Sequence, residues 1–101
     1  MGTAGKIKEQ TKTSQNIKVP RLYKVILYND DFTTMEFVVK ILMTVFSKSE
    51  QEAYEIMMAV HKGSFAMVGL YPRDLARTKV AIVTSMAREE GFPLKVEVEP
   101  E

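Results

Sequence analysis

The order of strand-like and helix-like segments is what most limits the folds open to this chain. Residues 22–28 are rich in β-branched and aromatic side chains and lie between Pro20 and Asn29, which predicts a buried strand. Residues 65–71 have a similar composition and predict a second strand. From residue 94 to 99, apolar and charged residues alternate, so we expect a final strand with one face exposed.

Three predicted helices fill the intervals between these strands. For the first, Thr33 is expected to be the N-cap and Glu36, three residues later, to complete a capping box. Ser49 and Glu52 form the same pattern at the start of the second helix, which Gly63 is expected to end.

The third helix is predicted from Arg73 to about Glu90, with Pro72 at its first turn and Gly91 after its end. The resulting order is β-α-α-β-α-β. We therefore predict an α+β fold in which three helices pack on one face of a small antiparallel sheet of three short strands.

The composition excludes several classes of protein. The chain has 101 residues and no cysteine, which rules out disulfides, zinc–thiolate sites and thiol nucleophiles. Its only histidine is His61, so no mechanism can use two imidazoles. A net charge of +1 and the lack of any apolar run near the roughly 20 residues that span a bilayer argue against nucleic-acid and membrane partners. We expect a soluble, cytoplasmic protein.

The first 19 residues differ from the rest. They contain four lysines against a single acidic residue, Glu9, and no aromatic residue. Such a segment buries too little apolar surface to offset the entropy of ordering it. We therefore predict a disordered extension at 1–19, which acts either as a plain solvated terminus or as a tether, and a folded core at 20–101.

A group of polar residues stands between the first predicted strand and the first predicted helix. Asn29, Asp30 and Asp31 are typical of a turn, and a carboxylate is favoured near a helix N-terminus. His61 lies near the end of the second predicted helix, where the helix dipole favours a positive charge. These residues therefore have a structural explanation as well as a functional one.

If they form one site, the neighbouring Met35, Val38 and Met57 give it an apolar wall, although these residues could equally be core filler. Oxygen acceptors beside an apolar wall suit a cation that carries an apolar group. The α-ammonium of a peptide is such a cation, because its pKa of about 7.7–8.0 leaves it mostly protonated at pH 7. It would donate to the amide oxygen, a carboxylate and the neutral imidazole, directly or through water.

Catalysis fits these residues less well. Adjacent aspartates lack the separation of a glycosidase pair, and Ser64 is not in a nucleophile elbow. Asp30, Asp31 and His61 match no metal-binding spacing, and no phosphate-binding glycine motif is present. We therefore predict a protein that is not an enzyme and has neither cofactor nor metal. A hydrolase or metal-binding domain is the weakest of the readings kept open.

Three segments together resemble the ClpS family of adaptor proteins. They are YKVILYNDDFTTMEFV at residues 23–38, AVH at residues 59–61 and ARTKV at residues 76–80. The resemblance extends over about residues 20–99. The chain departs from the family pattern at Gly63, since the family commonly has its glycine one position later, and at Arg77, where an acidic residue is common.

This resemblance implies an adaptor that binds N-terminal destabilising residues (Leu, Phe, Tyr and Trp). It implies delivery of these substrates to a ClpA-type AAA+ unfoldase for degradation by ClpP. Met35 would act as a gate against β-branched side chains, and the extension would be offered to the unfoldase. By position in the family motifs, the α-amino contacts are Asn29, Asp30 and His61, the pocket entrance and gate are Asp31, Thr33 and Met35, the side-chain pocket is Val38, Met57 and Leu94, and the unfoldase-contacting residues are Asp74 and Lys79.

A second reading from a different class stays open. The same fold could serve as a modulator of an AAA+ unfoldase, or as another protein–protein module, without a working N-degron pocket. The two readings differ in whether Asn29, Asp30 and His61 converge on one cavity beside Met35.

Overall fold

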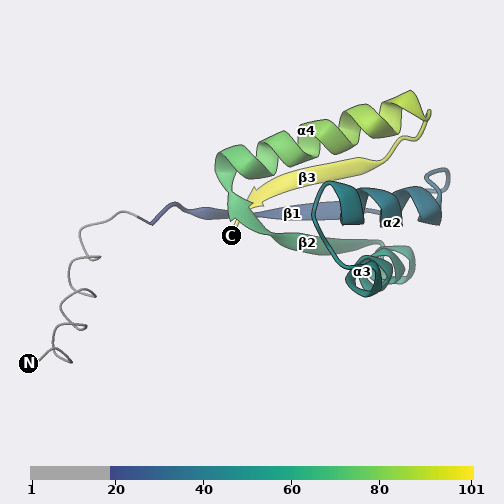
Figure 1. Ribbon diagram of the computed structural model, residues 1–101, viewed down its shortest axis with the longest axis horizontal. Helices are drawn as coiled ribbons and strands as arrows, with labels where there is room; N and C mark the ends of the chain where they lie inside the picture. The colour runs from purple at the N-terminus through teal and green to yellow at the C-terminus, as the bar shows by residue number, and fades with distance from the viewer. Residues whose placement is uncertain (1–18) are drawn as a thin grey trace, which may run out of the picture.

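The strand that precedes the polar residues is the middle strand of a three-stranded sheet. The computed structural model describes residues 19–101 and orders the strands β2-β1-β3, with both pairs antiparallel. Figure 1 shows the elements in chain order. They are β1 (Leu22–Tyr28), α2 (Met35–Thr44), α3 (Glu50–Gly63), β2 (Phe65–Pro72), α4 (Arg73–Glu89) and β3 (Lys95–Pro100).

The predicted α+β fold, with three helices and a three-stranded antiparallel sheet, is confirmed. Of the predicted extension, residues 1–18 lie outside the described part of the chain, and Val19 is exposed.

The strand register brings three chain segments together at one end of the sheet. Tyr28, the last residue of β1, lies opposite Phe65, the first residue of β2, and opposite Lys95, the first residue of β3. The loop after β1 and the junction between α3 and β2 therefore meet at the right-hand end of the sheet in Figure 1. The polar residues that follow β1 therefore begin at this end of the sheet.

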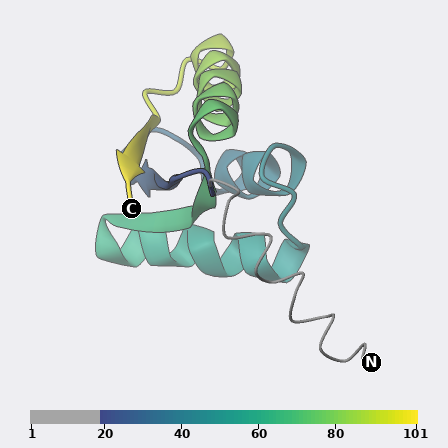
Figure 2. The same ribbon diagram turned by 90° about the vertical axis from the view of Figure 1, so that its left-hand side faces the viewer.

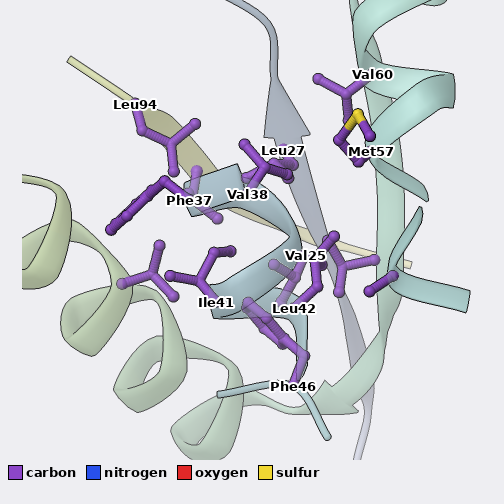
Figure 3. Close-up of a cluster of buried hydrophobic side chains, with 14 of the residues drawn as sticks. Val25, Leu27, Phe37, Val38, Ile41, Leu42, Phe46, Met57, Val60 and Leu94 are labelled. Atoms are coloured by element: carbon purple, nitrogen blue, oxygen red, sulfur yellow. The ribbon is translucent and has the colours of Figure 1, made fainter. Parts of the chain in front are cut away.

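All three helices contribute to one hydrophobic core with the sheet. Val25 and Leu27 of β1 are fully buried and point to the same face, because they are two residues apart on a strand. Figure 2 shows α3 beneath β2, with α2 and α4 to one side of the sheet. The core residues drawn in Figure 3 come from both strands and helices. No helix in the described residues is long and apolar enough to cross a membrane.

The first helix begins one residue later than its capping pattern predicts. The N-cap of α2 is Thr34, whose side chain accepts a hydrogen bond of 3.1 Å from the backbone N–H of Phe37. The prediction of Thr33 as N-cap, with Glu36 completing a box, is wrong. The hydroxyl of Thr33 instead donates a hydrogen bond to Oδ2 of Asp30, at 2.7 Å between the oxygens.

The predicted capping box of the second helix is confirmed. The hydroxyl of Ser49 accepts from the backbone N–H of Glu52, and the Glu52 carboxylate accepts from the backbone N–H of Ser49. The C-terminal end differs from the prediction, because the helix includes Gly63 and is capped by Ser64 with φ 79°. The left-handed residue at this turn is therefore a serine. The third helix ends as predicted, with Gly91 at φ 80° just beyond it.

Candidate binding site

The loop after β1 is tied directly to the end of α3. The backbone N–H of Asn29 donates to the carbonyl oxygen of Ser64 over 2.8 Å. His61 lies three residues before Ser64, in the last turn of α3. This bond therefore joins the start of the loop that carries Asn29 and Asp30 to the end of the helix that carries His61.

These two segments border a cavity of about 250 Å³. Its polar lining comes from the loop after β1 and the end of α3, and its apolar lining comes from α2 and the second half of α3. The lining residues are Asn29, Asp30, Asp31, Thr33, Met35, Val38, Met57, Val60 and His61.

The apolar wall belongs to the core. Val38, Met57 and Val60 are 6%, 4% and 3% exposed, so the little surface that each has left faces this space or its edge. In Figure 3, Met57 and Val60 project from α3 toward Leu27 of β1. Tightly packed walls of this kind cannot move far without straining the core behind them.

Asp30 organises the loop at the polar side. Its Oδ1 atom accepts from the backbone N–H groups of Phe32, at 2.8 Å, and Thr33, at 2.7 Å. Its Oδ2 atom accepts from the Thr33 hydroxyl at 2.7 Å. The loop is therefore built around this carboxylate, which has about four acceptor positions and keeps one for a further donor.

The same bonds set the charge of Asp30. Partial burial acts to raise the pKa of its carboxyl group, but the hydrogen bonds from Thr33 and Phe32 outweigh burial and hold the pKa below its ordinary value. Asp30 is consequently ionised at neutral pH. A negative charge beside an apolar wall is the arrangement that the sequence pattern predicted for a cation with an apolar appendage.

Eight residues that the resemblance assigned to the pocket line this cavity. Leu94 does not, because it is 2% exposed and lies in the core cluster. Val60 lines the cavity but was not predicted. Its position next to His61 and three residues after Met57, on the inward stripe of α3, was a signal that could have identified it.

The two residues assigned to the unfoldase surface lie elsewhere, on α4. Asp74 is exposed in the first turn of that helix. Lys79 is partly buried, and its Nζ atom donates to the carbonyl oxygen of Val45 at 2.7 Å. The same ammonium lies over the rings of Phe46, at 5.9 Å, and Tyr71, at 5.7 Å. It therefore caps the C-terminal end of α2, whose last turn has no basic residue of its own.

Nowhere in residues 19–101 do three or more histidine, cysteine or acidic side chains come close enough to hold a metal ion. The side chains that line the cavity provide an amide, two carboxylates, a hydroxyl and an imidazole together with aliphatic and thioether groups.

Comparison with known proteins agrees with the resemblance. Residues 18–97 match the family model of the ATP-dependent Clp protease adaptor protein ClpS. The chain is 51% identical over 90 residues to the Clp protease adapter ClpS of Acetivibrio thermocellus, which covers 89% of this chain and 91% of that protein. It is also 51% identical over 92 residues to ClpS of Deinococcus radiodurans, covering 91% and 81%.

Among solved structures, the chain is similar to Agrobacterium tumefaciens ClpS2 bound to L-phenylalaninamide. The TM-score is 0.79 with 44% sequence identity, and the match covers 82% of this chain and all of that one.

Proposed function

The chain belongs to the ClpS family of adaptor proteins of the ATP-dependent Clp protease, and from this premise we propose that its cavity binds the first residue of protein substrates. In this proposal the substrates are chains that begin with Leu, Phe, Tyr or Trp. The observation that carries it is that Asn29, Asp30 and His61 line one cavity together with apolar side chains.

The polar side accounts for recognition of a free amino group. An α-ammonium carries three donors. The amide oxygen of Asn29, the remaining acceptor position of Asp30 and the imidazole of His61 provide three acceptors in the lining of one cavity. The ionised carboxylate of Asp30 supplies the opposite charge, which strengthens hydrogen bonds to an ammonium.

The apolar side accounts for recognition of the first side chain. Val38, Met57 and Val60 form a packed wall, and Met35 lies at the edge of the cavity with 42% of its surface exposed. A side chain branched at Cβ is widest where it enters, so we assign Met35 the role of a gate that clashes with Ile and Val and admits Leu and aromatic side chains.

The similar structure from Agrobacterium tumefaciens supports this proposal. Its ligand, L-phenylalaninamide, has a free α-amino group, a phenyl side chain and an amide in place of the carboxylate. It thus carries the chemical groups of an N-terminal phenylalanine within a peptide. Because a protein of 44% identity binds such a ligand, the N-terminal residue of a protein is the ligand that we assign to the cavity of this chain.

For delivery, we propose a ClpA-type AAA+ unfoldase working with ClpP as the partner. Asp74 is free to contact it, and residues 1–19 would be the segment offered to the unfoldase. Lys79 would meet that partner through its stem and the surface around it, since its ammonium is bonded to Val45. No catalytic step is assigned to the adaptor.

The test is a fluorescence anisotropy titration with labelled peptides that differ only in residue one. Peptides starting with Leu, Phe, Tyr or Trp are expected to bind, and those starting with Ile or Val to bind far more weakly. N-acetylated copies of the Leu and Phe peptides are the matched controls, and they should not bind because the charge is gone.

Equal binding of free and acetylated peptides would exclude amino-group recognition. That result would favour the alternative function, a modulator of the unfoldase with the same fold and no working N-degron pocket.

A further inference from the structure

A second hollow adjoins the proposed pocket, because two residues line both of them. It is a shallow groove of about 410 Å³ between α2 and α3. From α2 it is lined by Met35, Glu36 and Val39, and from α3 by Tyr54 and Met57. These residues are mostly apolar, and their spacing of three or four places puts them on facing stripes of the two helices.

The groove and the pocket share a wall. Met35 and Met57 line both of them. The two spaces are therefore separated by little more than two thioether side chains. Met35 is 42% exposed, so part of its side chain is available to a ligand in the groove.

A shared lining links the pocket to a route by which a bound chain can leave it. In the proposed function Asn29, Asp30 and His61 hold the amino group, and the first side chain contacts the apolar residues. The rest of the substrate leaves past the partly exposed lining of the pocket, and Met35 belongs to that lining with 42% of its surface exposed. Met35 also lines the groove, so the groove lies on one route out of the pocket.

The geometry of an extended peptide selects which residue reaches it. Successive side chains point to opposite faces, so residues one and three point the same way while residue two points away. Residues one and three lie about 7 Å apart along the chain. This spacing suits two hollows that are divided by a single layer of side chains. Resting on the function proposed above, we propose that the groove binds the third residue of the substrate and prefers a large apolar side chain there.

The residues of the groove suit such an occupant. Tyr54 is 55% exposed, and Val39 lines the groove and packs against the core. An aromatic ring and an aliphatic base offer contact area to a leucine-sized side chain with little loss of conformational freedom. Glu36 is an exposed carboxylate at the edge, which would repel an acidic residue at this place.

The test uses three labelled peptides that all begin with Phe and continue with glycines. The first has no other apolar residue, the second has Leu at position two, and the third has Leu at position three. Leu at position three is expected to tighten binding about threefold to tenfold over the all-glycine peptide, because part of its surface is buried. Leu at position two should leave the affinity within about twofold.

The same titrations with Tyr54→Ser separate the groove from a general apolar effect. This substitution should remove the gain from Leu at position three and leave the all-glycine peptide unchanged. Ile82→Ser is the matched control, since Ile82 is 45% exposed on α4 and lies outside the residues lining the groove. It should keep the whole gain.

Each other outcome has one meaning. A gain at position two instead of three, or a gain that survives Tyr54→Ser, overturns the groove proposal. Binding of the all-glycine peptide with no gain from Leu at position three also overturns it, while leaving recognition of residue one intact. If the all-glycine peptide itself fails to bind, the proposed function fails first.

Discussion

Two charged side chains at opposite ends of the sheet are used in opposite ways. Asp30 follows the end of β1 that pairs with the start of β2, and Lys79 lies beside Tyr71, near the other end of β2. Asp30 keeps an acceptor position and faces a cavity. The Lys79 ammonium is bonded to Val45 and covers two aromatic rings.

The difference shows what makes a charge available to a ligand. At the Asp30 end, the donors that hold the carboxylate come from its own loop, and the carboxylate lines an open cavity. At the Lys79 end, the charge reaches across from α4 and fills the space between α2 and β2. The first charge is expected to control binding and the second to control stability.

Replacing Asp30 should produce the largest effect. Asp30→Ala removes the charge and the acceptor for three loop hydrogen bonds, so peptide binding is expected to weaken by about 2–5 kcal/mol. Asp30→Asn is the matched variant, because its amide oxygen can still accept the backbone bonds from Phe32 and Thr33. If the charge matters, Asp30→Asn should also bind weakly in a calorimetric titration while unfolding at nearly the normal temperature. Full affinity in Asp30→Asn would show that only the shape of the loop is needed.

Replacing Lys79 should affect stability and spare the pocket. Lys79→Met keeps most of the apolar stem but loses the hydrogen bond to Val45 and the contacts with the rings of Phe46 and Tyr71, for an expected loss of about 1–3 kcal/mol. Urea unfolding gives the free energy, and anisotropy with a Phe peptide gives the affinity. A large loss of affinity without loss of stability would contradict the division between the two ends.

The turn below the pocket offers a stabilising change. Ser64 has φ 79°, a conformation that costs a residue with a side chain about 1–2 kcal/mol, and glycine adopts it freely. Ser64→Gly is therefore expected to raise the free energy of unfolding by about 1 kcal/mol. Ser85→Gly, the same substitution in the helical backbone of α4, should lower it by about 0.5 kcal/mol. A loss of stability in both variants would contradict strain at Ser64.

Acid acting through Asp30 should produce the smallest of these effects. The pKa of Asp30 is lower in the folded chain than in the unfolded one, so its contribution is present above the unfolded pKa of about 3.9 and disappears as pH falls through the folded value. In urea unfolding at a series of pH values, the native chain should lose more stability below about pH 4 than Asp30→Asn does. Parallel curves would show that Asp30 does not titrate differently in the two states.

Most of the fold followed from local patterns in the sequence. The strand at residues 22–28 was predicted with its observed limits, and the capping box of Ser49 and Glu52 is present. The polar and methionine residues of the cavity were also identified, because strand ends and helix ends place side chains at predictable positions.

The errors arose where two residues compete for one role. Thr33 and Thr34 can both cap a helix. Only the three-dimensional structure shows that the Thr33 hydroxyl donates to Asp30, which leaves Thr34 as the N-cap. Gly63 is the usual residue for a left-handed turn, yet Ser64 adopts it. The family commonly has its glycine at that later position, so the register of the turn is kept and only the residue type differs. The bond between Lys79 and Val45 joins residues 34 positions apart, which no local pattern reveals.

The central place of β1 has a consequence for how long the recognition site survives thermal fluctuations. Both edges of β1 are hydrogen bonded, so local fraying of β2 or β3 leaves it paired on the other side. Each backbone amide of β1 donates to only one neighbouring strand, so detachment of β2 or β3 should expose to deuterated water only the amides bonded to that strand, while the others stay protected. Since the loop that begins at Asn29 is the direct continuation of this strand, the proposed recognition site is anchored to a segment that is released only when two separate pairings break.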